Sequence, residues 1–270
     1  SNLCVSGETP ILTSEGYIPI GELKDQDIHI WNGEEWSETT VRQTGCDQEL
    51  IKVVLSNGTE LECTPYHKFY IENGSRPAQY SKPIKVDAKD LVIGQKLIKH
   101  ELPSPIELPE SKDFPYAYTH GFFCGDGTVG KCRNGDPWPR INLYDEKKKL
   151  IEHLDFASSS LRETAKGVIN LSLHRDIPAK FSVPNANYSL KSRLEWLAGV
   201  FDADGCVAKN DKNQSIQMVS IHKDFLNNIM LMLQEIGIHS KVTHFSNAGH
   251  ALLPDGRGGE KLYETKESYR

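Results

Sequence analysis

Residues 197–205 read LAGVFDADG, and residues 119–127 read THGFFCGDG, a looser version of the same pattern. Both stretches end in Asp-Gly. Both also place small residues one helical turn apart, at Gly121, Gly125, Gly199 and Ala203. Small residues with this spacing let two helix backbones approach each other closely. If the two helices pack as a pair, their ends bring Asp126 and Asp204 together.

The sequence around these stretches is an internal repeat. One unit runs from HGFFCGDG through INLYDEKKKLIEHL, and a second runs from LAGVFDADG through SIQMVSIHKDFLNNIMLML. Each unit reads as helix, turn, strand and helix. Two related units within one region predict a single α+β domain with two pseudo-symmetric αβ repeats.

Apolar periodicity predicts where two of the helices lie. Residues 189–201 place an apolar face at Leu190, Leu194, Leu197 and Phe201, and Ser189 is a suitable N-cap. Residues 223–236 carry a second apolar face, which comprises Phe225, Leu226, Ile229, Met230, Leu233 and Ile236. Gly237 is the expected stop signal of that helix.

A proline-rich stretch separates this domain from the residues before it. The stretch at 103–116 contains Pro103, Pro105, Pro109 and Pro115, which exclude a regular helix or a central strand. Before it lie short β-branched or aromatic runs, with hairpin turns at Asn32-Gly33 and Asn57-Gly58. We therefore predict an all-β domain at 4–102, a linker at 103–116 and the α+β domain at 117–270.

Composition limits the classes of partner. The net charge of −6 divides unevenly: residues 1–100 carry −5, residues 101–116 carry −3, and residues 117–270 carry +2. Only the last region suits a phosphate-bearing partner, and it has no strong basic patch. No apolar run approaches the roughly 20 residues that a membrane helix needs. The first residues, SNLCVSGETP, lack the features of a signal peptide. We expect no membrane association and an intracellular, cytoplasmic protein.

Six cysteines occur in the chain, at positions 4, 46, 63, 124, 132 and 206. None belongs to a CxxC pair, and no Cys/His spacing indicates a zinc site. In a chain of this size, reduced thiols are the expected state.

LAGVFDADG at 197–205 resembles the signature of LAGLIDADG homing endonucleases, and 119–127 looks like a degenerate first copy. The 78 positions between Asp126 and Asp204 fit a two-repeat member. The resemblance implies site-specific cleavage of double-stranded DNA, with both aspartates catalytic and bound to Mg²⁺. Paired carboxylates need a cation, and Mg²⁺ takes one or two carboxylates plus water and phosphate oxygens. Such an ion activates water for attack on a phosphodiester. The alternative for both aspartates is an ordinary Asp-Gly turn.

The same resemblance implies that strands after each helix lie on the DNA major groove. The candidate contacts are Arg140, Lys209 and Lys212, for which an ordinary solvated charge is the alternative. HRDIPAKF at 174–181 resembles another endonuclease block, so Arg175 or Lys180 is a candidate to support the site. Asp202 has Cys124 as its counterpart in the first repeat, which favours a structural role for Asp202.

The all-β region carries a second pair of motifs. CVSGETPIL at 4–12 resembles the N-terminal splicing block of inteins, and GTELECTPYHKFY at 58–70 resembles their second block, with its Thr-x-x-His at Thr64 and His67. The resemblance implies the Hint fold, an all-β horseshoe. It also implies an insertion organisation in which the endonuclease interrupts a self-splicing domain, a combination that inteins are known for.

The intein resemblance assigns a reaction to these residues. Cys4 attacks the carbonyl of Leu3 and forms a thioester, because cysteine is the best side-chain nucleophile near neutral pH. His67 protonates the departing amide nitrogen, since its ordinary pKa lies near neutrality. Thr64 hydrogen-bonds the peptide that is cleaved. No cofactor is expected for splicing.

The flanks of the chain suggest a host. Residues 1–3 would be the remnant of the host protein, and Ser-Asn-Leu-Cys looks like the loop around the catalytic cysteine of ribonucleotide reductase large subunits. Inteins end with a His-Asn pair before Cys, Ser or Thr, whereas this chain ends in LYETKESYR. We therefore expect that a complementary C-terminal fragment completes a split intein, or that this part was removed or left out.

Three other interpretations stay open at this point. The chain is a homing endonuclease whose Hint portion is inactive and serves DNA binding, or it is a LAGLIDADG-type DNA-binding module with an inactive site. A third interpretation is an autoprocessing Hint domain of a secreted protein. The signature at 197–205 and the lack of a signal sequence argue against the third.

Overall fold

A computed structural model of the chain describes residues 3–74, 82–157, 161–209, 213–254 and 259–270. The chain divides into two compact units. The first unit comprises Ser1–Ile106 and Met230–Thr243, and the second comprises Glu107–Ile229 and His244–Arg270. No helix in the described part of the chain is long and apolar enough to cross a membrane.

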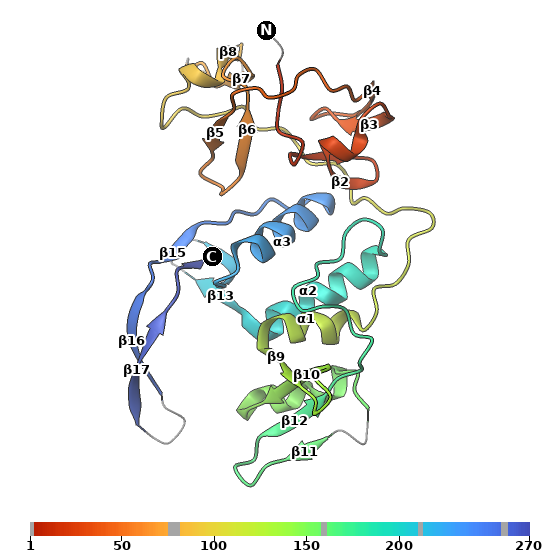
Figure 1. The fold of residues 1–270 in the computed structure, drawn as a ribbon, viewed down its shortest axis with the longest axis vertical. Coiled ribbons are helices and arrows are strands. Elements are labelled where there is room, and N and C mark those ends of the chain that lie inside the picture. Colours follow the sequence, from red (N-terminus) through yellow and green to blue (C-terminus); the bar gives the residue numbers. More distant parts are fainter. Residues whose placement is uncertain (1–2, 75–81, 158–160, 210–212, 255–258) are drawn as a thin grey trace. The chain divides into compact units, whose positions relative to one another are not determined.

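The first unit is built from short antiparallel strands (Figure 1). One sheet has the order β2-β1-β3-β4, formed by β1 (Pro10–Thr13), β2 (Gly16–Pro19), β3 (Asp27–Trp31) and β4 (Trp36–Thr40). Two hairpins follow, formed by β5 (Ile51–Val54), β6 (Glu60–Cys63), β7 (Lys68–Ile71) and β8 (Ile84–Asp87). Short 3-10 helices lie at η1 (Ile20–Leu23) and η3 (Ala88–Asp90). The strand content predicted for this region is therefore observed.

The two predicted hairpin turns of this unit are confirmed. Asn32-Gly33 joins β3 to β4, and Asn57-Gly58 joins β5 to β6. Gly33 has a φ of +105° and Gly58 a φ of +92°, a left-handed backbone that glycine adopts without steric cost. At Gly58 a side chain is also excluded by space, because an added Cβ would lie 2.0 Å from the Val242 carbonyl oxygen.

The segment Met230–Thr243 lies in the first unit, whereas the expected domain boundary placed it in the second. Hydrogen bonds across long sequence separations explain the difference. The amide of Val242 donates to the Asn57 carbonyl at 2.7 Å, and the amide of Tyr17 donates to Glu235 Oε1 at 2.9 Å. Such contacts between residues far apart in the sequence are not predicted by any local pattern.

The two predicted repeats belong to the second unit, except for the part of the last helix from Met230 onward, which is assigned to the first unit. The first repeat runs through α1 (Ala117–Asp126), β9 (Gly127–Lys131), β10 (Pro137–Leu143) and the 3-10 helix η4 (Asp145–His153). The second runs through α2 (Leu190–Asp204), β13 (Gly205–Lys209), β14 (Gln214–Met218) and α3 (Lys223–Glu235). Each repeat therefore has a two-stranded hairpin where a single strand was predicted, and the first ends in a 3-10 helix with no buried residue.

The remaining strands of this unit extend both repeats. They are β11 (Arg162–Glu163), β12 (Ile169–Ser172), β15 (His244–Ser246), β16 (Gly249–Pro254), β17 (Glu260–Thr265) and β18 (Ser268–Tyr269). The first repeat forms an antiparallel sheet with the order β11-β12-β10-β9. Strand β10 alternates between buried and half-buried residues, so one face of this sheet packs on the core and the other carries Trp138, Arg140 and Asn142.

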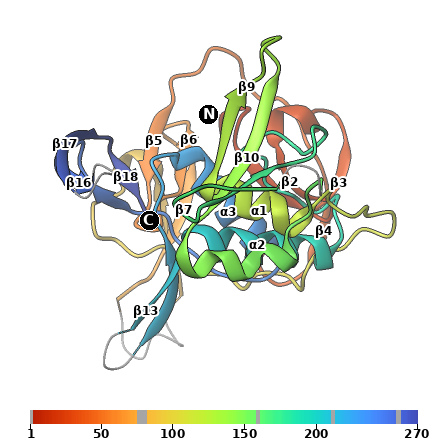
Figure 2. The same ribbon diagram turned by 90° about the horizontal axis from the view of Figure 1, so that it is seen from below.

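Helices α1 and α2 pack side by side, as their small residues predict (Figure 2). A Cβ added at Gly121 would lie 2.0 Å from the Trp196 carbonyl oxygen. A Cβ added at Gly199 would lie 2.0 Å from the Tyr118 carbonyl oxygen. The helices are thus in backbone contact, and only glycine fits at these two positions.

The N-cap of α2 is confirmed, and the predicted apolar face is buried only in part. Ser189 accepts a hydrogen bond from the Ser192 amide at 3.2 Å. Leu194 of the predicted apolar face is 47% exposed. The buried side chains include Leu197 of that face together with Arg193, Trp196, Val200 and Ala203. Because α1 packs against the backbone at Gly199, the buried surface of α2 is turned away from Leu194.

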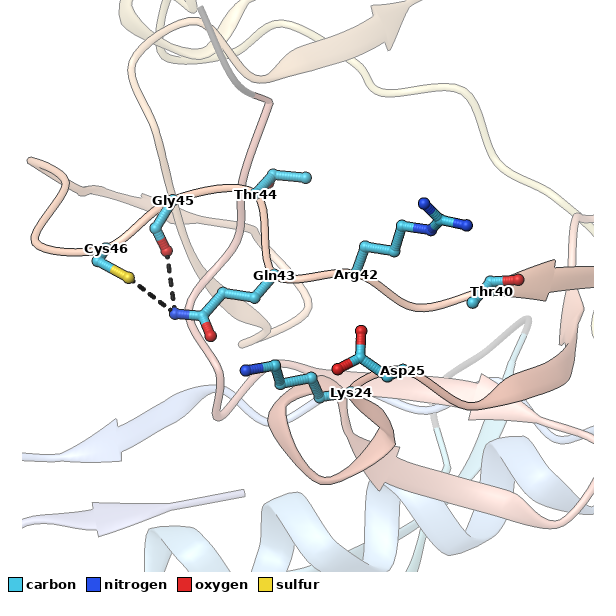
Figure 3. Close-up of a pocket in the computed structure, with 8 residues that line it drawn as sticks. All are labelled: Lys24, Asp25, Thr40, Arg42, Gln43, Thr44, Gly45 and Cys46. Carbon is cyan, nitrogen blue, oxygen red and sulfur yellow. Dashed lines mark hydrogen bonds between the residues drawn. The ribbon is translucent and has the colours of Figure 1, made fainter.

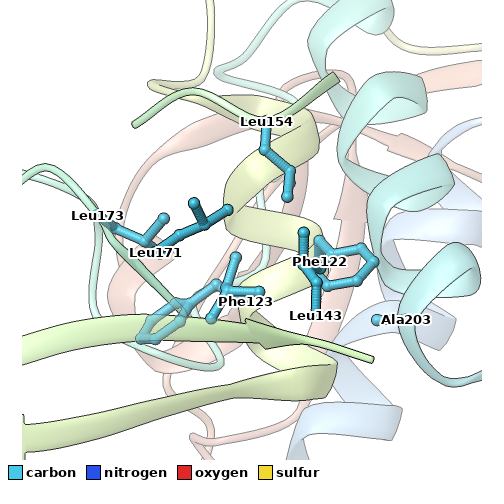
Figure 4. Close-up of a cluster of buried hydrophobic side chains, with 8 residues drawn as sticks. Phe122, Phe123, Leu143, Leu154, Leu171, Leu173 and Ala203 are labelled. Carbon is cyan, nitrogen blue, oxygen red and sulfur yellow. The ribbon is translucent and has the colours of Figure 1, made fainter. Parts of the chain in front are cut away.

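The hydrophobic core of the second unit lies beneath the sheet of the first repeat (Figure 4). Its buried members are Phe122, Phe123, Ile141, Leu143, Leu154, Leu171, Leu173 and Ala203. They come from α1, β10, β12 and α2 together with nearby loops. This core fixes the end of α1 relative to the sheet, and so positions the residues that follow.

Candidate functional sites

Two carboxylates meet where the paired helices end. Asp126 is the last residue of α1 and Asp204 the last residue of α2, and each is followed by a glycine that begins a strand. A Cβ added at Gly125 would lie 3.0 Å from Asp204 Oδ2. The carboxylate of one helix therefore lies against the last turn of the other, as the motif predicts.

Two lysines surround these carboxylates. The Lys147 ammonium, from η4, forms an ion pair with Asp126 and donates to the Ala203 carbonyl at 2.6 Å. Lys180 donates to the Gly127 carbonyl at 2.5 Å, next to Asp126 in the chain. Lys180 was a candidate from the sequence, whereas Lys147 was not. In the sequence Lys147 is one of three consecutive lysines, and such a run does not by itself predict a functional residue.

The pKa values of Asp204 and Lys180 are shifted by burial and by the neighbouring charges. Desolvation at the helix end, and then the charge of Asp126, raise the pKa of Asp204 above its ordinary value. The positive charges of Lys147 and Lys180 oppose that rise. Desolvation lowers the pKa of Lys180, against the attraction of the two carboxylates. Like charges held close together favour a bound cation.

A buried network holds the Lys180 loop beside α1. Trp196 Nε1 donates to His120 Nδ1 at 2.8 Å, which leaves His120 Nε2 to donate to the Ala179 carbonyl at 3.1 Å. The Phe181 amide donates to Cys124 Sγ at 3.4 Å. Phe181 has a φ of +73°, a rare backbone for a bulky residue, so these contacts stabilise an unusual turn at Lys180.

Two positions of the motif have structural partners. Asp202 accepts a hydrogen bond from the Tyr118 hydroxyl at 2.7 Å, in line with the structural role expected for it. Burial raises the pKa of the Cys124 thiol to about 12, so this thiol stays protonated near neutral pH. Cys124 therefore acts as a small packing residue and not as a ligand.

The predicted DNA contacts lie in different surroundings. Arg140 lies on β10, opposite Thr128 and Ser172, and its guanidinium stacks 4.7 Å from the Trp138 ring centroid. Lys209 is exposed at the end of β13, whereas Lys212 lies outside the described residues. The Arg175 side chain is 73% exposed and pairs with Asp136, at 3.8 Å, rather than with Asp126 or Asp204.

The carboxylate site offers oxygen ligands of the kind that a divalent cation such as Mg²⁺ takes. No group of three or more His, Cys, Asp or Glu side chains able to hold a metal occurs in the described ranges. Asp126, Asp204 and the Ala203 carbonyl supply oxygens only. Mg²⁺ is commonly held by one or two carboxylates and completed by substrate phosphates and water. The residues therefore fit an ion that is shared with a nucleic acid.

The predicted splicing residues meet in the first unit. The Cys4 amide donates to Thr64 Oγ1 at 3.2 Å, and the Thr64 amide donates to the Cys4 carbonyl at 2.9 Å. Next to this pair, Val5 and Cys63 form an antiparallel bridge. Val5 thus lies along the end of β6, and the amide of the Leu3–Cys4 peptide is held by Thr64 of the Thr-x-x-His motif.

His67 lies on the turn after Thr64. Its amide donates to the Thr64 carbonyl at 2.9 Å, and its ring packs edge-on against Phe69. Desolvation lowers the pKa of His67, so the imidazole is neutral near pH 7. His67 Nδ1 is buried without a hydrogen-bond partner among the described residues. A buried imidazole nitrogen that makes no hydrogen bond is available for proton transfer.

A pocket that the sequence did not reveal lies beside the loop at residues 42–46 (Figure 3). Its volume is about 690 Å³, and it is lined by Lys24, Asp25, Thr40, Arg42, Gln43, Thr44, Gly45 and Cys46. Thr44 Oγ1 lies 3.0 Å from Cys4 Sγ. The side-chain amide Nε2 of Gln43 donates to Cys46 Sγ at 3.0 Å and to the Gly45 carbonyl at 3.3 Å. These two bonds shape the loop. Residues 42–46 have no periodicity or motif that would have marked them.

A protein-family model matches the region that contains LAGVFDADG. Residues 191–266 match the model of the LAGLIDADG-like domain. A solved structure of I-DmoI in complex with its target DNA, nicked in the coding strand and in the presence of 2 mM Mn, is 13% identical to this chain. The matched region covers 56% of this chain and 87% of the I-DmoI chain. The TM-score is 0.29, which is too low to support an argument about the fold.

Curated relatives extend the likeness to the whole chain. The ribonucleoside-diphosphate reductase large subunit of Invertebrate iridescent virus 6 is 45% identical over 278 residues, which cover 100% of this chain and 28% of that protein. The ribonucleoside-diphosphate reductase NrdEB subunit alpha of Bacillus subtilis is 27% identical, with the same two coverages. An ATP-dependent DNA helicase of Methanocaldococcus jannaschii is 26% identical over 89% of this chain and 21% of its own length.

The chain thus spans less than a third of each of these relatives. Over its whole length the chain is similar to a segment of two ribonucleoside-diphosphate reductase subunits, and its residues 191–266 match the LAGLIDADG-like domain. Both findings support the recognition that the motifs predicted.

Proposed function

We propose that the chain is an intein that begins protein splicing at the Leu3–Cys4 bond, and that its second unit is a site-specific DNA endonuclease. The relatives support an inserted element. Similar stretches occur in a reductase and in a helicase, and they make up only 28% and 21% of those proteins. A segment shared by enzymes with unrelated reactions is explained by insertion and not by a common catalytic task.

The contact between Cys4 and Thr64 carries the splicing proposal. Thr64 bonds the amide nitrogen that must leave when the Leu3–Cys4 peptide opens, at 3.2 Å. The second bond, from the Thr64 amide to the Cys4 carbonyl, fixes the orientation of Cys4. A held amide has less freedom to move away from the attacking thiol, which lowers the entropic part of the barrier.

The first step is an isomerisation in which no water is consumed. Neutral His67 accepts the Cys4 thiol proton, and Sγ attacks the Leu3 carbonyl carbon. The proton then passes to the amide nitrogen, the C–N bond breaks, and Leu3 becomes a thioester on Cys4 with a free α-amine. A neutral imidazole suits this sequence, because it serves first as base and then as acid. The Hint horseshoe is the fold that we propose for the strands of the first unit.

Reporter release tests the splicing proposal. A folded reporter protein placed before Ser1 is released by hydroxylamine if Leu3 is a thioester, and the Cys4→Ser variant gives an oxygen ester that reacts more slowly. Release of the reporter from wild type, with none from Cys4→Ala, supports the proposal. Equal stability of all three fusions contradicts it and leaves an endonuclease whose first unit has no splicing activity.

For the second unit we propose Mg²⁺-dependent cleavage of double-stranded DNA at the insertion site in a ribonucleotide reductase gene. Asp126 and Asp204 would hold the ion together with phosphate oxygens, and the ion would supply a water nucleophile. Lys180 stabilises charge on the phosphate, and Arg140 on β10 contacts the duplex. The support is the LAGLIDADG match and the packed pair of helix ends. Incubation with a plasmid that carries the uninterrupted reductase gene tests it, with Asp204→Asn as the inactive control.

A further inference from the structure

Lys147 occupies a position that has no role in the function proposed above. Its ammonium forms an ion pair with Asp126, which belongs to α1, and donates to the carbonyl of Ala203, which belongs to α2. It also lies over the Phe122 ring, 5.9 Å from the centroid. A single positive charge therefore joins the ends of the two paired helices.

The oxygens that Lys147 contacts are those that a cation at this site needs. A carboxylate and a backbone carbonyl are hard oxygen ligands of the kind that Mg²⁺ and Mn²⁺ take. The Lys147 side chain is 38% exposed and that of Asp126 is 27% exposed, so the pair lies at the rim of the site and water can reach it. A flexible lysine in such a place can leave without unfolding the surrounding helix.

We infer that Lys147 is an internal competitor of the divalent cation: it neutralises Asp126 in the free protein and must move aside before a metal ion binds between the helix ends. The inference rests on the proposed endonuclease function. It adds a condition under which the metal ion binds to the site. DNA phosphates attract the displaced ammonium, so substrate and metal ion bind together more readily than the metal ion binds alone. The free protein is thereby kept at low metal occupancy.

Metal binding without DNA tests the inference. Mn²⁺ is titrated into the full chain at constant pH, and the free ion is measured by electron paramagnetic resonance. Lys147→Met should bind Mn²⁺ about tenfold more tightly than wild type, because the metal ion no longer has to displace an ammonium group from Asp126. Lys147→Arg keeps the charge and should stay as weak as wild type.

The matched control is Lys149→Met, in the same 3-10 helix, whose ammonium pairs with Glu146 instead. It should leave Mn²⁺ affinity unchanged. Adding Asp204→Asn to Lys147→Met should remove the gain, which locates the ion at the helix ends. Equal or weaker binding by Lys147→Met would overturn the inference. Because no DNA is cleaved in this titration, loss of nuclease activity alone leaves its result intact, and the plasmid assay tests that activity separately.

A thermal shift gives a second readout that does not depend on the spectroscopic signal. Without a metal ion, Lys147→Met leaves Lys180 as the remaining positive charge that opposes the two carboxylates, and its Tm should lie below that of wild type. Added Mn²⁺ should raise the Tm of the variant more than that of wild type, since stabilisation grows with ligand affinity. An equal rise in both proteins would contradict competition at this site.

Discussion

The amide nitrogen of Cys4 donates a hydrogen bond to Thr64 Oγ1 at 3.2 Å, although 60 positions separate the two residues. The amide of Thr64 returns a bond to the Cys4 carbonyl. The peptide bond before Cys4 is therefore held by the second of the two motifs that predicted the reaction. This contact makes the roles of Thr64 and His67 testable one by one.

Removal of the Thr64 hydroxyl should slow thioester formation. Thr64→Val keeps the shape of the side chain but loses the acceptor for the Cys4 amide. We expect a rate about ten- to a hundredfold lower, the usual effect of losing one aligned hydrogen bond in a reacting site. Thiol-induced release of residues 1–3, followed by mass spectrometry over time, measures the rate. Thr39→Val, at an exposed position of β4, is the control that should leave it unchanged.

The rate should persist below the pH at which an ordinary histidine becomes charged. Desolvation lowers the pKa of His67 below its usual 6.5, so the imidazole stays neutral and able to accept a proton as the pH falls through 6.5. Activity is lost only when the pH reaches the lowered pKa. His67→Gln should reduce the rate about a hundredfold. The ratio of the two rates between pH 5 and 8 reports His67, and an inflection at or above pH 6.5 would be inconsistent with this environment.

The backbone contact between α1 and α2 should not tolerate a methyl group. Gly121→Ala and Gly199→Ala each place a Cβ 2.0 Å from a carbonyl oxygen of the partner helix. We expect each change to lower the free energy of unfolding by about 3 kcal/mol, at the upper end of the cost of overpacking. Denaturation of the second unit, followed by circular dichroism, measures the loss. Gly249→Ala on β16, where the nearest atom to the added Cβ is 4.0 Å away, should cost little.

Asp204, the carboxylate that we propose for DNA cleavage, should also destabilise the fold. The pKa of Asp204 is raised, so the folded protein holds this proton more strongly than the unfolded chain, and stability falls as the pH rises through and above 3.8. Asp204→Asn should therefore abolish DNA cleavage and raise the Tm at pH 7, with no gain near pH 3. Glu163→Gln, an exposed carboxylate of β11, should change neither activity nor Tm. A lower Tm for Asp204→Asn at pH 7 would show that the carboxylate stabilises the site.

The elements that local rules govern were predictable from the sequence. Ser189 caps α2, Gly237 ends α3 with a φ of +81°, and the two Asn-Gly turns join the expected strands. Spacing alone also placed the small residues of α1 and α2 in contact. Each of these features depends on residues within a turn or two of one another, or on a repeated motif.

Features that depend on distant partners were not predictable. The buried face of α2 follows from the approach of α1 and not from its own apolar spacing, so Leu194 is exposed. Lys147 lies 21 residues from its partner Asp126 and gains a role only through the fold. The loop at residues 42–46 reaches Cys4 through tertiary structure alone. Met230–Thr243 joins the first unit for the same reason.

Intact mass of the purified chain, before and after incubation with a thiol, tests the central claim most directly. If Cys4 forms a thioester with Leu3, wild type loses the mass of Ser1-Asn2-Leu3, and Thr64→Val loses it more slowly. Cys4→Ala keeps its full mass under the same conditions. An unchanged wild-type mass, or the same loss from Cys4→Ala, would contradict the assignment of Cys4 as the splicing nucleophile.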